Sequence, residues 1–436
     1  MLKPVSPSVV SAKDAAGPGL FPSRLEFNAP AHGVWNIVHI GMLVPQAHQI
    51  YICAINCMRG VVLTAAEMNA ADRFSCVVLR EEDVVAGTVE EVTLRGVIDV
   101  LEKLPALPPC VLVFPVCTHH FLGIDLGRVY AALEARFPQV TFVRCFMDPI
   151  MQKQGLPADQ RLRRSMYDPL PPGPANGAVA SLLGCDFPLE PDADLRALLS
   201  GHGLALRELP GCQTYDDYLA LGQAETILAV FPGGAYGAAQ TAKRLGRRYL
   251  YLPMSFDYGQ IAASWQAAAE HFGFPLPELS SEIAACDQAL AEARRVIGSA
   301  AIAIDATVHP RPLELAKLLL EHGFRVTEVY LDAVNGEEQA ALAWLRENAP
   351  ELALSSTILP DRRVASRSRS EPFLAIGQKA AWFTGTSHFV NLVQGGGLWG
   401  FAGVRTMARY MVQAWQTEQD PEDLIPRKGL GCESCI

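Results

Sequence analysis

The sequence has no long hydrophobic run and no excess of basic residues. No apolar stretch reaches the roughly 18 residues that a membrane-spanning helix requires, and the opening segment MLKPVSPSVVSAKDAAG lacks the hydrophobic core of a signal peptide. With 36 basic and 46 acidic side chains, the formal charge is −10, which argues against binding to a nucleic-acid backbone. These absences predict a soluble cytoplasmic protein with neither a nucleic-acid nor a membrane partner.

Several catalytic motifs are absent as well. The chain contains no GxSxG nucleophile turn, no HExxH metal helix and no P-loop lysine. It also shows no internal repeat of short period and no low-complexity segment. We therefore expect no nucleotide site on this chain and no hydrolase chemistry of these two motif types.

Strand-like and helix-like patterns alternate along the chain. The continuous apolar run Cys110–Phe114 is followed by helical spacing over Leu126–Arg136 and by a second strand at Gln139–Arg144. Two similar strand–helix–strand units follow, one between Thr226 and Leu252 and one between Ala301 and Leu331. Because continuous apolar strands that alternate with helices are typical of parallel sheets covered on both faces, an α/β fold is predicted.

The 436 residues are too many for one hydrophobic core. The three strand–helix–strand units predict three doubly wound, Rossmann-like domains with parallel sheets. The Pro-rich segment Asp168–Gly177 is the clearest linker candidate between two of them. We predict a flexible lead at 1–25, Rossmann-like domains at 26–172, 173–295 and 296–420, and a tail at 421–436.

Eleven cysteines are the most unusual feature of the composition. Cys53 and Cys57 are four residues apart, and Cys117 follows the predicted strand at Cys110–Phe114 in the segment Cys-Thr-His-His. Thiolates are the usual ligands of iron–sulfur clusters, which ordinarily take four of them. Three thiols would leave a ligand to be supplied by another subunit. Inert core thiols are the alternative, which the spacing alone leaves equally open, and a zinc site is less favoured.

The remaining cysteines have simpler interpretations. The C-terminal CxxC pair, Cys432 and Cys435, could bind metal or cycle between thiol and disulfide. Chain ends are usually poorly ordered, so we favour the interpretation that this pair has no function. We interpret the others as buried thiols: Cys76, Cys110, Cys145, Cys185, Cys212 and Cys286.

Two further loops contain candidate residues. His388 precedes three consecutive glycines at 395–397, which can allow a ligand to approach the backbone closely. This histidine is a candidate metal ligand or proton donor, and a structural role is its alternative. Pro232-Gly233-Gly234 follows a predicted strand, and we interpret it as a plain turn.

Taken in order, these motifs resemble the nitrogenase component 1 superfamily. Asn56-Cys57-Met-Arg-Gly60 resembles its first cysteine turn, and the segment Phe114–Asp125 resembles its second cysteine loop. His388 followed by Gly400-Phe-Ala-Gly403 resembles the last domain, where a histidine holds the active-site cofactor. The likeness covers most of the chain, although Cys53 lies later in the sequence than the family's earliest cysteine. The family's cofactor cysteine has no counterpart near Pro232–Ala235.

The resemblance implies a component 1-type fold and an oxidoreductase subunit. It implies that Cys57 and Cys117 hold an iron–sulfur cluster, P-cluster-like or 4Fe–4S, at an interface with a paralogous subunit. We choose Cys53, which departs from the family pattern, as the third ligand. The assembly would be an α2β2-type heterotetramer or a homodimer, and a separate ATP-dependent iron–sulfur reductase protein would supply electrons. A second nitrogenase-type iron–sulfur cofactor would lie at His388, which would act in catalysis on a small-molecule substrate.

Two segments, HQIYICAINCMRGVVLTAAEM and AIGQKAAWFTGTSHFVNLV, are most similar to the branch that includes methylthio-alkane reductase. This similarity implies reductive cleavage of carbon–sulfur bonds in small methylthio compounds. Three alternatives stay open. The chain could be a non-catalytic partner or a cluster-assembly scaffold of the same superfamily, a tetrapyrrole reductase subunit, or a ligand-binding protein without clusters.

Overall fold

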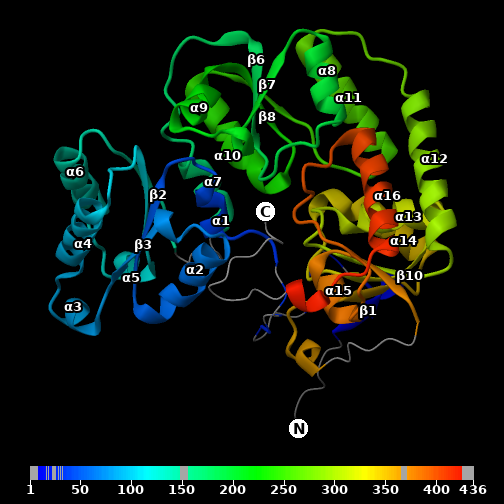
Figure 1. Ribbon diagram of the computed structural model, residues 1–436, viewed down its shortest axis with the longest axis horizontal. Helices are drawn as coiled ribbons and strands as arrows, with labels where there is room; N and C mark the ends of the chain where they lie inside the picture. The colour runs from blue at the N-terminus through cyan, green and yellow to red at the C-terminus, as the bar shows by residue number, and fades with distance from the viewer. Residues whose placement is uncertain are drawn as a thin grey trace. The chain divides into compact units, whose positions relative to one another are not determined.

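The computed structural model describes residues 8–15, 17, 19–21, 26–27, 29, 31, 33–147, 156–364 and 371–424 (Figure 1). The Cys432/Cys435 pair and most of the predicted tail lie outside these residues. The chain divides into two compact units. Unit 1 comprises the described residues of Met1–Val34 and Leu252–Pro426 together with Leu189–His202, and unit 2 comprises those of Trp35–Pro188 together with Gly203–Tyr251.

The first sheet of unit 2 is parallel and has the strand order β3-β2-β4-β5. Its strands are β2 (His48–Cys53), β3 (Phe74–Val78), β4 (Cys110–Pro115) and β5 (Thr141–Arg144). Its helices are α1 (Ile37–Met42), α2 (Ile55–Glu67), α3 (Glu81–Val85), α4 (Val89–Lys103), α5 (Cys117–Phe121) and α6 (Leu126–Arg136). Apolar residues of α1 and α2 cover one face, and those of α4 and α6 cover the other. Every residue of β2 and β4 is therefore buried.

The second sheet of unit 2 is also parallel, in the order β7-β6-β8-β9. Its strands are β6 (Asn176–Gly184), β7 (Ala205–Glu208), β8 (Ala224–Ala229) and β9 (Arg248–Tyr251). The main helices are α7 (Ala158–Ser165), α9 (Tyr215–Ala220) and α10 (Pro232–Leu245). A single apolar core, which includes Phe114 of the first sheet and Leu183 and Ile227 of the second, joins the two sheets.

The interpretation of Pro232-Gly233-Gly234 as a plain turn is wrong. These residues form the first turn of α10, where proline is tolerated because its missing N–H has no partner there. A Cβ at Gly234 would lie 2.6 Å from the Cα of Gly184, so glycine lets the helix lie directly against β6. Close packing, rather than a reversal of the chain, explains the glycine pair.

Unit 1 is built on one six-stranded sheet in the order β1-β12-β11-β10-β13-β14. The strands are β1 (Val9–Ser11), β10 (Ala301–Asp305), β11 (Arg325–Tyr330), β12 (Ala353–Ser355), β13 (Phe373–Ile376) and β14 (Phe389–Val390). The helices are α8 (Asp194–Gly201), α11 (Tyr258–Phe272), α12 (Ser280–Ile297), α13 (Pro312–Glu321), α14 (Gln339–Asn348), α15 (Gln378–Thr384) and α16 (Gly400–Gln416). All strand pairs are parallel except β1 with β12.

The predicted α/β fold class with parallel sheets is confirmed. Two expected elements, at Leu126–Arg136 and Ala301–Asp305, have the bounds that their apolar patterns predicted. Residues 9–11, inside the segment predicted as a flexible lead, form strand β1 in the sheet of unit 1. The domain boundaries themselves stay a prediction. Among the described residues, no helix is both long and apolar enough to cross a membrane.

Candidate functional site

Cys53, Cys57 and Cys117 follow two neighbouring strands of the first sheet. Cys53 is the last residue of β2, Cys57 lies in the first turn of α2, and Cys117 begins α5 just after β4. Strands β2 and β4 are parallel, and their register pairs Ile52 with Pro115. Because parallel strands end at the same edge of a sheet, all three cysteines lie at the carboxyl edge, where ligands of open α/β sheets bind.

The three thiols differ in accessibility. Cys53 is fully buried in the core, Cys117 is half-buried, and Cys57 is exposed. Burial, together with charge repulsion from the nearby thiols of Cys76, Cys57 and Cys117, raises the pKa of Cys53 to about 12. Without a cation, Cys53 is thus a neutral thiol at physiological pH. A bound metal cation would stabilise the thiolate form of Cys53.

The donor set at this edge can be compared with the group that the component 1 resemblance implies. Within the part of the chain that the structure describes, no three His, Cys, Asp or Glu side chains converge on a point that one metal ion would fill. The three thiols do match the ligand chemistry of an iron–sulfur cluster, and they supply three of the four thiolates that a cluster ordinarily takes. The chemistry of these donors is thus compatible with a cluster that another chain completes, and their role as ligands stays a prediction.

His119 fixes α5 beside Cys117. Its Nδ1 accepts a hydrogen bond from the Val116 N–H at 3.2 Å, and its Nε2 lies 2.9 Å from the Thr93 hydroxyl of α4. That hydroxyl donates to the Val89 carbonyl at 2.7 Å, so Nε2 donates its proton to the Thr93 oxygen. Burial also lowers the pKa of His119. The sequence suggested no such role for His119, although it shows that this histidine lies two residues after Cys117.

The structure places His388 at the amino edge of its sheet, whereas the three cysteines lie at the carboxyl edge of theirs. It immediately precedes β14, and its carbonyl accepts a hydrogen bond from the Ala375 N–H at 3.0 Å, so it lies at the amino edge of the unit 1 sheet. Its Nδ1 is 3.2 Å from the Ala414 carbonyl, and its ring lies 5.0 Å from that of Trp415. These contacts anchor the end of α16. A role of His388 in holding a cofactor stays a prediction.

The triple-glycine loop after β14 is closely packed. The backbone N–H groups of Gln394 and Gly395 donate to the carbonyls of Thr307 and Val308, both at 2.7 Å, in the loop after β10. Gly395 has a φ of +85°, and a Cβ there would lie 2.4 Å from the Met254 side chain. These glycines therefore serve the packing of unit 1 and do not form an open cradle.

The Gly400-Phe-Ala-Gly403 element forms the first turn of α16. The Asp194 carboxylate of α8 accepts a hydrogen bond from the Ala402 N–H at 3.1 Å and lies 3.6 Å from Arg405. Burial raises the pKa of Asp194 to about 6. A protein carboxylate thus occupies the anion-binding position at this helix N-terminus.

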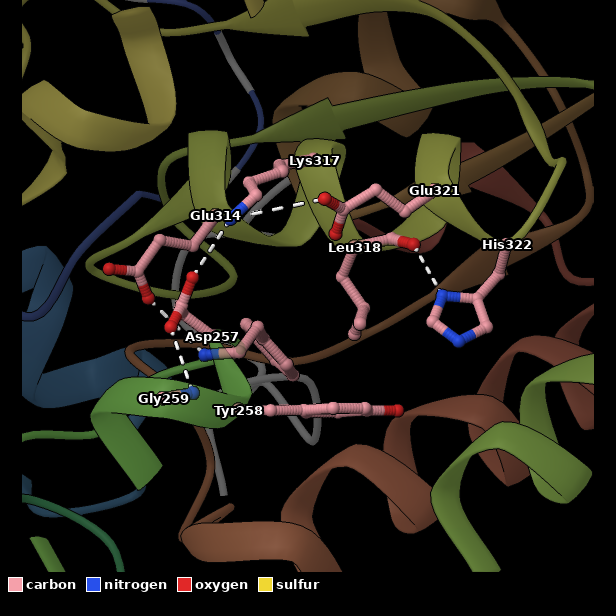
Figure 2. Close-up of a pocket in the computed structure, with 9 residues that line it drawn as sticks. Asp257, Tyr258, Gly259, Glu314, Lys317, Leu318, Glu321 and His322 are labelled. Carbon is pink, nitrogen blue, oxygen red and sulfur yellow. Dashed lines mark hydrogen bonds and ion pairs between the residues drawn. The ribbon is translucent and has the colours of Figure 1, made fainter. Parts of the chain in front are cut away.

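A cavity of about 250 Å³ lies between the start of α11 and one face of α13 (Figure 2). The Lys317 Nζ is 2.9 Å from the Asp257 carboxylate and 4.0 Å from that of Glu321. In Figure 2, the Tyr258 ring lies below Leu318, at the opposite end from the Lys317–Asp257 pair. No sequence motif predicted this site, although the spacing of Glu314, Lys317 and Glu321 places them on one helix face.

Beside this cavity, the buried Glu338 caps α13, and it makes the stability of unit 1 dependent on pH. Its carboxylate accepts hydrogen bonds from the N–H groups of Leu313 at 2.6 Å and Glu314 at 3.2 Å. Burial nevertheless raises its pKa to about 8, so folding favours the protonated form. This contribution to stability is complete below the ordinary glutamate pKa and is lost as the pH rises through about 8.

We therefore expect the unfolding free energy of the wild-type protein to fall relative to that of Glu338→Gln as the pH rises from about 5 to about 9. Glutamine keeps a carbonyl acceptor for both N–H groups but does not titrate. Urea denaturation at a series of pH values measures the difference between the two slopes. Parallel slopes for wild type and variant would contradict the assignment to Glu338.

The architecture can now be compared with known proteins. No protein-family model matches the sequence, and no curated protein sequence does. A solved structure of nitrogenase Cp1 at pH 6.5 matches with a TM-score of 0.64 at 12% identity, over 91% of this chain and 95% of that chain. The chain has the fold of nitrogenase Cp1. A structure of nitrogenase Cp1 at pH 5 gives a TM-score of 0.57 at 13% identity, over 94% and 93% of the two chains.

Proposed function

We propose that the protein is a subunit of a nitrogenase-like two-component iron–sulfur reductase. The observation that carries this proposal is the position of Cys53, Cys57 and Cys117 at one carboxyl edge of a chain with the Cp1 fold. These thiols hold an iron–sulfur cluster that a paralogous subunit completes. A separate ATP-dependent reductase protein supplies its electrons, because this sequence contains no P-loop lysine.

The surface beside the thiols supports a partner subunit. Ile55, two residues before Cys57, is 70% exposed, and Phe121, four residues after Cys117, is 65% exposed. Large apolar side chains so exposed are candidates for burial in an interface. A subunit that covered them would also exclude water from the cluster and could bring the missing ligand.

The substrate class follows from the resemblance of the segments at 48–68 and 375–393 to the methylthio-alkane reductase branch. In that reaction a small methylthio compound, R–S–CH₃, takes up two electrons and two protons, and its R–S bond breaks to give R–H and methanethiol. The reductase protein provides both electrons. A second nitrogenase-type iron–sulfur cofactor would supply the redox chemistry. This chain contributes the position, hydrogen bonding and shielding of its own cluster.

One observation favours a second candidate, the non-catalytic partner subunit of the same assembly. His388 lies at the amino edge of the unit 1 sheet, and the loop at the carboxyl end of β14 is a packed glycine turn. We expect His388→Ala to leave the turnover and the metal content of the assembled enzyme unchanged. Loss of both, in a variant that still assembles, would assign the catalytic role to this subunit.

Anaerobic purification of the chain with its paralogous subunit tests the proposal. Iron and acid-labile sulfide analysis should give a stoichiometric cluster, and electron paramagnetic resonance should detect it after reduction. Turnover with the reductase protein should then release methanethiol from a small methylthioether and leave a tetrapyrrole unchanged. A folded, active and colourless protein without stoichiometric iron would overturn the assignment.

A further inference from the structure

A cavity of about 360 Å³ lies beside α5, at the carboxyl ends of β4 and β5. Its walls are mostly apolar and include Val116, Ile124, Leu126 and the ring of Phe146. The volume lies within the range of small-molecule sites, which are usually apolar with a few polar groups that orient the ligand. Nothing in the proposed cluster chemistry uses this space.

The charged group in the cavity wall is the guanidinium of Arg161, on α7. It lies 6.0 Å from the centroid of the Phe146 ring, so the cation and the aromatic face form one corner of the cavity. Among the described residues it has no carboxylate within ion-pair distance, whereas Arg163, two positions further, pairs with Asp159 and Asp186. Arg161 is therefore a cation that is available to a ligand.

The two histidines of α5, His119 and His120, are also compatible with an anionic ligand. Both ring nitrogens of His119 are engaged within the protein, but the exposed side chain of His120 makes no hydrogen bond with any described residue. No aspartate or glutamate is among the described residues that line the cavity. The described lining thus carries one guanidinium and no carboxylate, which favours a negatively charged ligand.

We propose that this cavity binds a small organic anion, a carboxylate or phosphate monoester carried on a flat apolar body. Arg161 pairs with the anionic group, the Phe146 ring and the aliphatic wall contact the body, and His120 donates a further hydrogen bond. A guanidinium suits both anions, because its fork of N–H groups matches two oxygens. The binding step requires no cluster, so it stands independently of the proposed reductase function.

Isothermal titration calorimetry of the full-length protein with benzoate, phenyl phosphate, inorganic phosphate and benzamide tests the proposal. At least one aromatic anion should bind about tenfold more tightly than neutral benzamide, because only the anion makes a charge-assisted hydrogen bond with Arg161. The tighter of benzoate and phenyl phosphate identifies the anionic group. Binding of inorganic phosphate as tight as that of either would show that the apolar wall contributes nothing, and would overturn the proposal.

Matched arginine variants locate the site. Arg161→Gln should weaken binding of the aromatic anion at least about tenfold, and Arg161→Lys should restore part of it. Arg164→Gln removes the same charge from an exposed position one turn along α7, and should leave the affinity unchanged. Equal affinities in Arg161→Gln and wild type, or equal losses in the Arg161→Gln and Arg164→Gln proteins, would overturn the proposal. Iron content should be the same in all of these variants, which separates this test from that of the cluster.

Discussion

Cys117→Ala and Cys57→Ala are each expected to lose most of the iron that the wild-type assembly retains. Both thiols are accessible from the carboxyl edge of the first sheet, and removal of one ligand from an incomplete set leaves an iron of the cluster without its thiolate. Iron and acid-labile sulfide per chain, measured after anaerobic purification with the paralogous subunit, report the loss. Electron paramagnetic resonance of the reduced protein should lose its signal in parallel.

Cys212→Ala is the matched control. This thiol is also half-buried in unit 2, but its Sγ faces the Glu208 carbonyl at 3.5 Å, at the end of β7. The control should keep wild-type iron. Equal iron in the Cys117→Ala and Cys212→Ala proteins would exclude Cys117 as a ligand.

Cys53 requires a separate comparison because it is buried in the core. If Cys53 is a cluster ligand, the Cys53→Ala and Cys53→Ser proteins should both lose iron. If it is only a core thiol, the Cys53→Ala protein should lose a modest part of its unfolding free energy but keep its iron. The raised pKa of this thiol makes the first outcome informative, because only a bound cation would favour its thiolate.

Gly377→Ala is expected to destabilise unit 1 strongly. Gly377 has a φ of +114°, and a Cβ there would lie 2.3 Å from the Asp305 carboxylate. That buried carboxylate accepts hydrogen bonds from the N–H groups of Thr307 and Ala380, both at 2.7 Å, and so joins the end of β10 to the first turn of α15. Displacing it leaves buried donors without an acceptor, so we expect a loss of about 3 kcal/mol or more.

Tryptophan fluorescence during urea denaturation measures this loss selectively. Five of the six tryptophans belong to unit 1, namely Trp265, Trp344, Trp382, Trp399 and Trp415. Gly336→Ala is the control, because its Cβ would meet nothing within 4 Å, and its effect should stay within about 0.5 kcal/mol. A Gly377→Ala protein as stable as this control would contradict the described contact with Asp305.

The regular elements could be predicted wherever the amino-acid pattern was strong. The run AIAID at Ala301–Asp305 is fully buried, as a central parallel strand requires. The run Cys110–Phe114 likewise predicted that Cys117 follows a strand, whereas the strand that ends at Cys53 was not predicted. The burial of Cys53 was not predictable, because it depends on side chains of other elements that cover the strand end.

The position of His388 shows where local patterns fail. Strand β14 has two residues, Phe389 and Val390, which is too short for a recognisable period. Without that strand, nothing in the sequence indicated that His388 comes before a strand and not after one. The packed state of Gly395 depends in the same way on Met254, a residue far away in the sequence.

The pairing of β1 with β12 has a consequence for synthesis of the chain on the ribosome. Val9 pairs with Ser355, so the partner strand of β1 is not available until most of the chain has been translated, and the edge of β1 stays unpaired until then. By then, unit 2, whose described residues end at Tyr251, has all of its segments available. Unit 2 is therefore expected to fold first, and a ribosome stalled before residue 353 should yield a protease-resistant unit 2 beside a protease-sensitive unit 1.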